Sequence, residues 1–407
     1  MLERIVIVGA GQAAVQAVDT LRRRGFTGAI SVLGDEPWLP YQRPPLSKAY
    51  LAGALDRERL LLRPAAFYES HGVEVRLGCR VQEVLRGERR VRLADGSTLP
   101  YDALLLATGS RARPLAAAGA DLEGVHFLRG IADVERIRAE LAGARRLVIV
   151  GGGYIGLEVA ATATQAKIEV TVLEMTDRVM NRVVCPEVSA FFASEHARRG
   201  ARVRCNSRVR ELVARPGSRA VRAVVTDDGE EHPADMVLLA CGALPNDELA
   251  SAAGLSCENG IAVDEHCRTS DPLIYAAGDC TSHPSPHYGR RVRLESVDNA
   301  FEQGVSAALN MLGIDTVHDK VPWFWSDQHD LNLIIVGMSQ GHDSVVLRGD
   351  PAARSFSACY LRDGELIAVD AINSPKDQMA ARKLIAARAR PALEKLVDFS
   401  VPLKDAV

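Results

Sequence analysis

Two glycine-rich turns in this chain have the spacing of a phosphate-binding turn. Their small residues are Gly9, Gly11 and Ala14 in the first turn and Gly151, Gly153 and Gly156 in the second. In such a turn the free N–H groups and the dipole of the following helix point at a pyrophosphate, and a Cβ on the glycines would block its approach. Alanine is a permitted variant at the third position. The pattern therefore predicts one bound dinucleotide at each turn.

An acidic residue follows each turn at the distance where a carboxylate meets the ribose hydroxyls of a dinucleotide. These residues are Asp35 and Glu174, and Glu174 lies 21 residues after Gly153. A carboxylate there accepts from a 2′-hydroxyl and repels a 2′-phosphate, which favours NADH over NADPH at the second turn. Arg178 leaves the alternative open, because an arginine can receive the phosphate.

The elements around both turns follow the order strand, turn, helix, strand. The expected segments are residues 4–8, a helix to about 24 and residues 30–33 for the first turn, and residues 146–150, a helix to about 166 and residues 169–173 for the second. Strands that alternate with helices form parallel sheets. We therefore expect an α/β fold with two Rossmann-like nucleotide-binding domains.

The first turn is assigned to FAD, because a flavin dinucleotide extends well past one turn and needs a second segment for its ribityl chain and ring. Residues 275–279 supply that segment, since Asp279 follows Gly278 at the end of a strand and can accept from a ribityl hydroxyl. A helix expected from about Ser296 comes next. Its N-terminus can face the pyrimidine edge of the flavin and stabilise the reduced anion.

Later segments complete the expected architecture. Strands at residues 104–108 and 236–242 close the two units, and the strand at 273–277 and the helix at 296–312 return to the first. Beyond Val321 the pattern predicts short strands and a last helix, at residues 333–336, 344–347, 355–360, 366–371 and 377–389. The expected domains are FAD-binding (1–113 and 243–320), NAD-binding (114–242) and C-terminal α+β (321–407).

Composition and charge exclude several classes of protein. The 407 residues are 47% hydrophobic and carry 49 basic and 52 acidic side chains, which indicates a globular chain of several domains without affinity for nucleic acid. Apolar runs are far shorter than the roughly 20 residues that cross a bilayer, and the first begins at Ile5, so we expect no membrane segment, no targeting peptide and a cytoplasmic location. The eight cysteines lack metal or redox spacing, so buried thiols and no metal site are expected.

Longer motifs carry a resemblance to a known family. They are Tyr41-Gln42-Arg43-Pro44-Pro45-Leu46-Ser47-Lys48, Leu106-Ala107-Thr108-Gly109, the second glycine turn through Glu158, Gly278-Asp279, and Pro322-Trp323-Phe324-Trp325-Ser326-Asp327-Gln328. With them, essentially the whole chain resembles the ferredoxin reductases of bacterial oxygenase systems, within the glutathione-reductase-like flavoprotein fold. The resemblance implies FAD and NADH as cofactors. It also implies a [2Fe–2S] ferredoxin partner that feeds a haem-thiolate monooxygenase or a Rieske dioxygenase.

The resemblance also assigns site residues. On the FAD side it implies contacts at Ala13, Asp35, Arg43, Lys48, Val81, Ala107, Gly109, Arg129, Asp279 and Val297. On the NADH side it implies Gly151, Gly153, Ile155, Gly156, Glu174, Arg182 and Gly242. Trp323 and Trp325 either lie near the exposed flavin edge or belong to a strand-face core.

The implied chemistry is hydride transfer from NADH to the flavin, followed by two one-electron transfers to ferredoxin. Lys48 and Glu158 are expected to form a buried ion pair beside flavin N5, with Glu158 in the first turn of its helix. The lysine would stabilise electron density that arrives with the hydride, and the carboxylate would keep the cation fixed and charged.

Three other functions share parts of this sequence pattern. Disulfide reductases of this fold carry redox cysteines near the flavin, where this chain has residues 43–48 and no cysteine before Cys79. An NADH oxidase or quinone-type reductase would differ only in its electron acceptor. A redox-signalling protein like apoptosis-inducing factor shares the proline–lysine string but should show a targeting segment and basic surfaces. The local cluster Arg290, Arg291 and Arg293 suits either an acidic ferredoxin or a solvated face, and the oligomeric state stays open.

Overall fold

The structure is a computed structural model that describes residues 2–407. It divides into two compact units, each assembled from separate stretches of chain. The first unit contains the residues up to Gln42, Arg57–Arg111 and Leu244–Pro322, and the second contains Arg43–Asp56, Ala112–Ala243 and Trp323–Val407. The two strands β8 (Ser110–Ala112) and β17 (Ala243–Pro245) carry the chain from one unit to the other and back.

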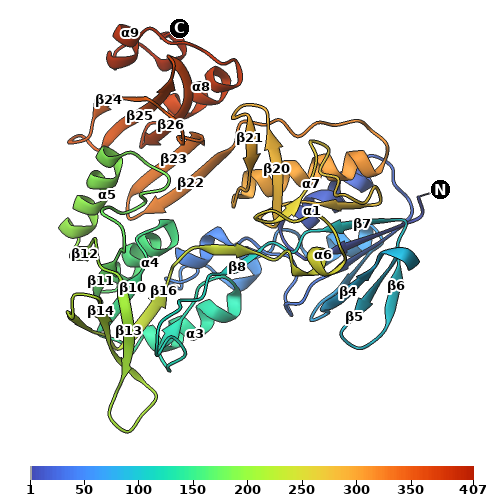
Figure 1. Cartoon of the computed structure of the whole chain (residues 1–407), viewed down its shortest axis with the longest axis horizontal. Coiled ribbons are helices and arrows are strands. Elements are labelled where there is room, and N and C mark those ends of the chain that lie inside the picture. The colour runs from blue at the N-terminus through green and yellow to red at the C-terminus, as the bar shows by residue number, and fades with distance from the viewer. Residues whose placement is uncertain (1) are drawn as a thin grey trace. The chain divides into compact units, whose positions relative to one another are not determined.

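The first unit contains the elements that surround the first glycine turn (Figure 1). They are β1 (Arg4–Val8), α1 (Gln12–Arg23), β2 (Ala29–Leu33), η2 (Arg57–Leu60), α2 (Ala65–Ser70), β3 (Val73–Arg76), β4 (Val81–Leu85), η3 (Arg86–Glu88), β5 (Arg90–Leu93), β6 (Thr98–Pro100), β7 (Ala103–Leu106), α6 (Glu248–Ala252), β18 (Ile261–Ala262), β19 (Ile274–Ala276), β20 (Thr281–Ser285), β21 (Arg290–Val292) and α7 (Val297–Met311).

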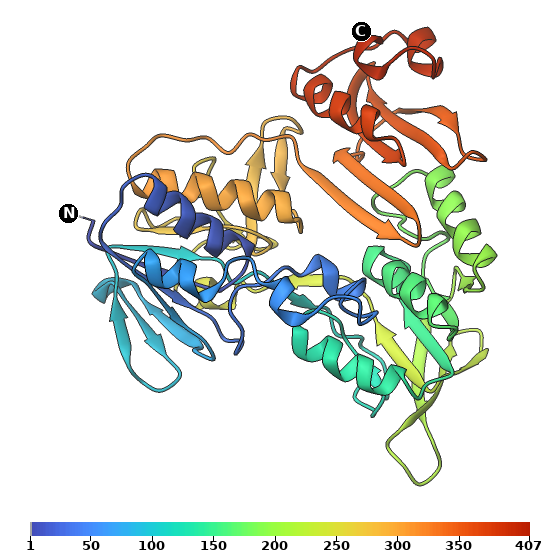
Figure 2. The same ribbon diagram turned by 180° about the vertical axis from the view of Figure 1, so that it is seen from behind.

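A five-stranded parallel sheet, ordered β19-β7-β1-β2-β3, forms the centre of the first unit. Side chains of a strand alternate between its two faces, so β1 contributes residues to two hydrophobic cores, one on each face of the sheet. Ile5 and Ile7 pack with residues of α1 and α7, and Val6 and Val8 pack on the opposite face with residues of the antiparallel sheet β4-β5-β6. Figure 2 shows α1 and α7 side by side over their face of the sheet. The N-terminus of α1 therefore lies at the edge of the sheet where the parallel strands have their carboxyl ends.

The second unit contains the second glycine turn, the proline-rich segment and the C-terminal region. Its elements are η1 (Pro44–Ser47), β9 (Val125–His126), α3 (Ile131–Leu141), β10 (Arg146–Val150), α4 (Tyr154–Gln165), β11 (Glu169–Leu173), α5 (Pro186–Arg198), β12 (Arg202–Arg204), β13 (Val209–Ala214), β14 (Val221–Thr226), β15 (Glu231–Pro233), β16 (Met236–Leu239), β22 (Trp323–Gln328), β23 (Leu331–Gly337), β24 (Ser344–Asp350), β25 (Ser355–Arg362), β26 (Glu365–Ile372), α8 (Pro375–Ala386), α9 (Leu393–Val397) and η4 (Leu403–Asp405).

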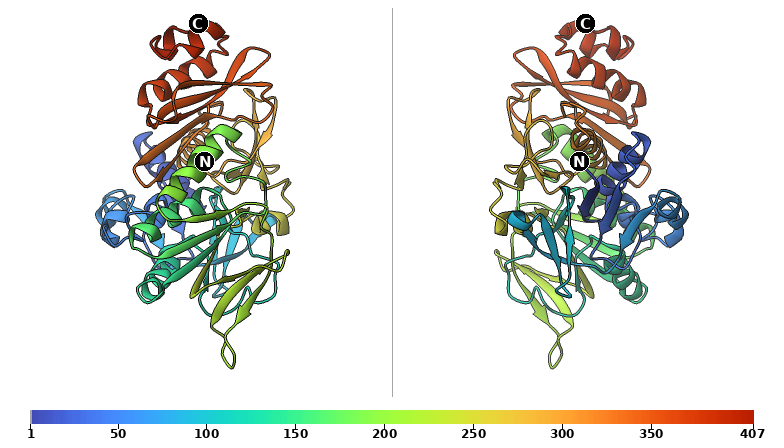
Figure 3. Two further views of the ribbon diagram at one scale, coloured as in Figure 1. Left: turned by 90° about the vertical axis from the view of Figure 1, so that its left-hand side faces the viewer. Right: turned by 90° about the vertical axis from the view of Figure 1, so that its right-hand side faces the viewer.

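The second unit repeats the plan of the first. A parallel sheet ordered β12-β11-β10-β16-β9 is covered on one face by the antiparallel sheet β13-β14-β15. Val148 and Val150 of β10 pack there against Leu212 and Val224. The turn that joins β13 to β14 projects from the rest of the sheet in both views of Figure 3.

The C-terminal region of the second unit is an antiparallel sheet ordered β22-β23-β26-β25-β24, with α8 packed on β26 and β23. Short turns join β22 to β23, β24 to β25 and β25 to β26, which are antiparallel neighbours, whereas the connection from β23 leads to the edge strand β24. The first strand, β22, also contacts α4, the helix that follows the second glycine turn.

The sequence predictions of fold and elements are largely confirmed, with two differences. The structure joins the expected NAD-binding and C-terminal domains into one compact unit, and it adds Arg43–Asp56 to them rather than to the expected FAD-binding domain. The small sheets β4-β5-β6, β13-β14-β15 and β18-β20-β21, the helices α2, α3, α5, α6 and α9, and the strands β3, β8, β9, β12, β17 and β22 were not predicted. Most of these elements are short, which weakens their periodic signal. The three-domain division remains a prediction.

Candidate functional site

In the first glycine turn, the fold requires a glycine at one position but not at another. Gly9 has a φ of +110°, and a Cβ on it would lie 2.0 Å from the carbonyl oxygen of Ala107. Gly11 is extended, and a Cβ on it would meet no atom within 4 Å. Helix α1 has no side-chain cap and no acidic residue in its first turn. The turn therefore leaves open space before N–H groups that need an acceptor, which fits a pyrophosphate.

The second turn repeats this arrangement. Gly151 has a φ of +113°, and a Cβ on Gly156 would lie 2.2 Å from the carbonyl oxygen of Gly151. A Cβ on Gly153 would meet nothing within 4 Å, and α4 has neither a side-chain cap nor an acid in its first turn. Ile155 is 41% exposed at the same helix end.

The two predicted ribose-binding acids differ in their surroundings. Asp35 is exposed just beyond β2. The carboxylate of Glu174 is held in place, since its Oε2 accepts from the N–H of Gly152 at 2.7 Å and its Oε1 accepts from the N–H of Thr176 at 2.8 Å. Arg178 donates to the carbonyl oxygens of Val184 and Asn181, at 2.7 and 3.0 Å. The guanidinium of Arg178 is thus already engaged by the backbone.

Two other predicted NADH-side residues come together. Gly242 has a φ of +95°, and a Cβ on it would lie 3.5 Å from Nη2 of Arg182. Gln340 Nε2 donates to the carbonyl oxygen of Arg182 at 3.0 Å, which fixes the backbone of that loop. The guanidinium of Arg182 therefore lies over the glycine that follows β16.

The Gly278-Asp279 turn of the first unit rests on a buried glutamine that sequence reasoning missed. Gln303 is fully buried on α7, and its Oε1 accepts from the N–H of Gly278 and the hydroxyl of Thr281, both at 2.8 Å. Ser110 Oγ donates to Asp279 Oδ2 at 2.8 Å. A glutamine two turns inside a helix carries no signal in sequence that it will support a distant turn.

The other FAD-side residues of the first unit lie at strand and helix ends. Ala107 follows β7, and its N–H donates to Val8 at 2.7 Å, while Gly109 has a φ of +67°. Val297 begins α7, whose N-cap Ser296 accepts from the N–H of Asn299. Val81 begins β4 and is half-buried.

The second unit brings the proline segment against helix α4. Lys48 Nζ lies 2.7 Å from Glu158 Oε2, which confirms the predicted ion pair as a contact. The side chain of Glu158 is 4% exposed and that of Lys48 is 19% exposed, so only the carboxylate is fully buried. Glu158 lies in the second turn of α4 rather than the first, because the helix begins at Tyr154.

The carboxylate of Glu158 receives two further donors, both missed from sequence. Ser47 Oγ donates to Oε2 at 2.5 Å, and Ser326 Oγ of β22 donates to Oε1 at 2.6 Å. Lys48 Nζ also donates to the carbonyl oxygen of Pro44 at 3.2 Å. Three donors compensate this buried carboxylate for the water that it loses. Nearby, Arg43 Nη1 donates to the carbonyl oxygen of Arg129 at 2.7 Å, which joins two predicted FAD-side residues.

Several expectations need correction. Trp323 and Trp325 stack on each other with ring centroids 5.4 Å apart and are only half-buried on β22, so their place near the flavin edge stays a prediction. Of the eight cysteines, all unbonded, Cys185, Cys267, Cys280 and Cys359 are buried and the others are only partly so.

Two arginines of the basic cluster are engaged by neighbouring groups of the first unit. Arg291 donates to two backbone carbonyls and Arg293 pairs with Glu295 at 2.5 Å.

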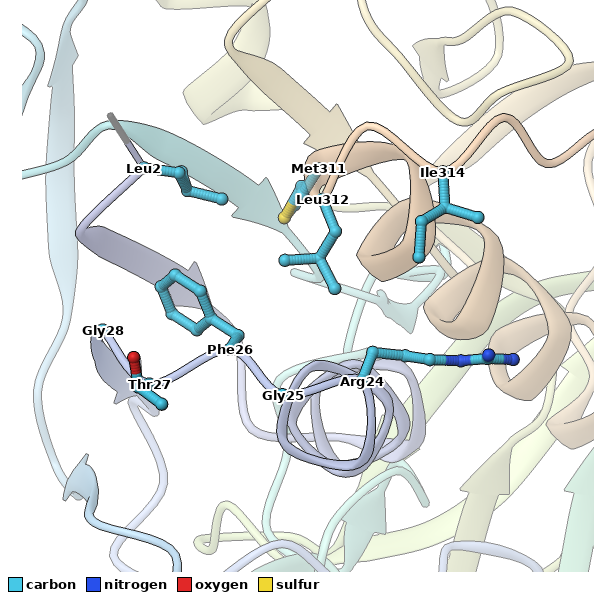
Figure 4. Close-up of a pocket in the computed structure, with 9 residues that line it drawn as sticks. All are labelled: Leu2, Arg24, Gly25, Phe26, Thr27, Gly28, Met311, Leu312 and Ile314. Atoms are coloured by element: carbon cyan, nitrogen blue, oxygen red, sulfur yellow. The ribbon is translucent and has the colours of Figure 1, made fainter.

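Residues 2–407 show no group of three or more metal-ligating side chains and no helix that is long and apolar enough to span a membrane. A shallow pocket of about 370 Å³ lies at the far end of α1 and α7 from the glycine turn, where the side chains of Leu2, Phe26 and Leu312 converge and Arg24 extends away (Figure 4). Its lining combines apolar side chains with Arg24, Thr27 and two glycines, and it holds none of the predicted site residues.

Comparisons with known proteins agree with this geometry. Residues 3–304 match the family model described as pyridine nucleotide-disulphide oxidoreductase. The chain belongs to this family. Residues 323–407 match a second model, described as the reductase C-terminal domain. FAD and NAD(H) are the cofactors of these oxidoreductases, which confirms the two cofactors expected from the sequence.

Individual members of the family are similar over their whole length. Putidaredoxin reductase of Pseudomonas putida is 42% identical, over 100% of this chain and 97% of its own. The anthranilate 1,2-dioxygenase system ferredoxin–NAD(+) reductase component of Burkholderia cepacia is 44% identical, over 98% of each chain. The crystal structure of the covalent putidaredoxin reductase–putidaredoxin complex contains a chain with 42% identity and a TM-score of 0.96, over 99% of this chain and 98% of that one. These matches confirm the fold class and the resemblance stated from the sequence.

Proposed function

We propose that this chain is an FAD-containing, NADH-dependent reductase that passes electrons to a [2Fe–2S] ferredoxin of an oxygenase system. One observation carries the proposal: each unit has a glycine turn whose middle glycine leaves open space before an uncapped helix N-terminus. Two such turns suit one flavin and one nicotinamide dinucleotide. A Burkholderia cepacia relative that is 44% identical over 98% of this chain supports the choice of acceptor, because it is named as the ferredoxin–NAD(+) reductase component of an anthranilate 1,2-dioxygenase system.

The bound groups would be divided between the two turns. FAD would be held by the first glycine turn and by Asp35, Arg43, Lys48, Val81, Ala107, Gly109, Arg129, Asp279 and Val297. NADH would be held by the second turn and by Ile155, Glu174, Arg182 and Gly242. When bound, the flavin supplies a centre that accepts a hydride and releases its electrons singly.

We propose Lys48 and Glu158 as the catalytic pair. An ammonium group in a partly dry site stabilises negative charge more strongly than it would in water. Glu158 holds the cation in place, because its carboxylate contacts Lys48 Nζ at 2.7 Å and is itself fixed by two hydroxyl donors.

NADH is proposed over NADPH because of the surroundings of Glu174. Its carboxylate is anchored to the glycine turn through the N–H of Gly152, so it cannot swing aside to admit a phosphate without losing that bond. Arg178, the residue that leaves NADPH open in the sequence, is engaged by two backbone carbonyls. We further propose a cytoplasmic location and the three-domain division of residues 1–113 with 243–320, 114–242 and 321–407.

The decisive experiment measures NADH-driven reduction of cytochrome c with and without candidate [2Fe–2S] ferredoxins. We expect little reduction without ferredoxin, a large increase with a cognate one, and release of FAD rather than FMN on denaturation. Rapid reduction of oxygen or quinone that no ferredoxin accelerates would favour the NADH oxidase or quinone-type alternative. Recovery of FMN, or no flavin uptake, would refute the assignment of the first turn.

A further inference from the structure

The carboxylate of Glu158 is the end of a buried chain of hydrogen bonds. Its Oε1 accepts from Ser326 Oγ at 2.6 Å, and Ser326 Oγ accepts from Gln328 Nε2 at 3.2 Å. Gln328 Oε1 lies 2.9 Å from His196 Nε2. Ser326, Gln328 and His196 are each 0% exposed. This series of hydrogen bonds joins helix α4, strand β22 and helix α5, all within the second unit.

Every bond in this chain has a direction set by the carboxylate. An ionised carboxylate only accepts, so the hydroxyl proton of Ser326 must point to Glu158. Ser326 Oγ must then accept from the amide NH₂ of Gln328, which leaves the amide oxygen of Gln328 facing His196. His196 must therefore donate through Nε2–H. Burial lowers the pKa of His196, so its ring is neutral near pH 7 and carries a single proton.

The other ring nitrogen of His196 fits this direction. Among the described residues, Nδ1 of His196 is buried and has no hydrogen-bond partner. A neutral imidazole chooses the tautomer that satisfies its better partner, and only Nε2 has one. Met180 Sδ accepts weakly from Gln328 Nε2 at 3.9 Å, which supports the same orientation of the amide.

We propose that Ser326, Gln328 and His196 are positioning residues for the Lys48–Glu158 pair, in a one-way hydrogen-bond chain that holds His196 as its Nε2–H tautomer. The proposal rests on the catalytic role proposed for Lys48 and Glu158. It assigns to the C-terminal region a function in the chemistry of the second unit, because β22 supplies the donor that fixes the second oxygen of Glu158.

The physical need for such a chain follows from burial. Glu158 is 4% exposed, so each oxygen without a donor would carry an uncompensated desolvation cost. Lys48 and Ser47 occupy Oε2, and Ser326 is the donor found on Oε1. Without that donor the carboxylate can rotate about its last bond, and Lys48, which is held by Glu158 and the carbonyl of Pro44, loses its fixed position.

The first test is spectroscopic, and the tautomer is measured on the wild-type holoenzyme. Long-range ¹H–¹⁵N correlation spectra of protein labelled at histidine report the tautomer of each ring, and His196→Gln identifies the His196 signals by their loss. We expect the neutral Nε2–H tautomer at pH 7. Observation of the Nδ1–H tautomer would overturn the proposal, because Gln328 would then have to donate to His196 and could not also donate to Ser326.

The second test follows flavin reduction by NADH in stopped flow. We expect Ser326→Ala to slow it about tenfold, a change of about 1.4 kcal/mol in the barrier, and Ser326→Thr to restore most of the rate by returning the hydroxyl. Gln328→Leu should have a smaller effect in the same direction. Ser357→Ala is the matched control. Ser357 is fully buried and donates to the carboxylate of Asp377 at 2.9 Å, but it takes no part in the hydrogen bonds that lead from Glu158 to His196. Equal rates for Ser326→Ala and wild type would overturn the proposal.

A double variant separates this proposal from the function on which it rests. If Ser326 acts through Glu158 on Lys48, then Ser326→Ala added to Lys48→Met should slow reduction no further. Full additivity would show that Ser326 acts by another route and would overturn the positioning role. Wild-type speed in Lys48→Met alone would instead refute the catalytic role of the pair, whatever the tautomer of His196.

Discussion

Replacement of Gly153 by alanine should separate the binding role of a glycine turn from its folding role. Gly153 has a φ of −81°, which any residue adopts, and a Cβ on it would meet no atom within 4 Å. The only folding cost is the poorer N-cap propensity of alanine, about 1 kcal/mol or less. A change of that size lowers the Tm of a unit of this size by about 2–4 °C at most.

The effect on NADH should be much larger. The new methyl group would occupy the space in front of the uncapped N–H groups of α4, where a pyrophosphate must approach. Loss of one hydrogen bond to a charged group costs about 1.5–3 kcal/mol. We therefore expect the Kd for NAD⁺ and NADH to rise about 10- to 100-fold, while the FAD content stays that of wild type.

Calorimetric titration with NAD⁺ and thermal unfolding of the same samples measure both effects. Gly151→Ala provides the contrast, since Gly151 has a φ of +113° and its Cβ would lie 2.3 Å from the carbonyl oxygen of Ala240. That variant should lose stability first. A Gly153→Ala protein that binds NAD⁺ within twofold of wild type would show that the second turn does not hold the pyrophosphate.

Three further predictions follow from other residues. Glu174→Ala should narrow the preference for NADH over NADPH in steady-state kinetics, and a wild-type enzyme that already used both equally would contradict the role of Glu174. Cys79→Ser should reduce its flavin within a few-fold of wild type, whereas a folded, FAD-loaded variant without turnover would revive disulfide chemistry. Burial raises the pKa of Asp370 to about 7, so its contribution to stability is complete below about pH 4 and is lost as the pH rises through 7. Urea unfolding between pH 4.5 and 7.5 should show that loss in wild type and not in Asp370→Asn.

The local elements of this protein could be predicted because their signals are local. The strand Glu169–Leu173 was predicted with its bounds, and the helix expected at residues 296–312 was found at Val297–Met311. Glycine spacing likewise located both turns, since a positive φ at Gly9 and at Gly151 is a requirement of the backbone itself. The contact between Lys48 and Glu158 was predicted only through resemblance to a family, because no local pattern joins residues 110 positions apart.

The sequence by itself determined where the glycine turns and the strands and helices that flank them lie, because each depends on the side-chain period and backbone freedom of a few neighbouring residues. Only the tertiary structure decided what surrounds the carboxylate of Glu158. Ser326 and Gln328 sit in a strand whose aromatic residues dominate its pattern, and His196 lies in an ordinary helix. They meet through packing of β22 and α5 against α4, and a buried carboxylate needs donors wherever the fold can bring them.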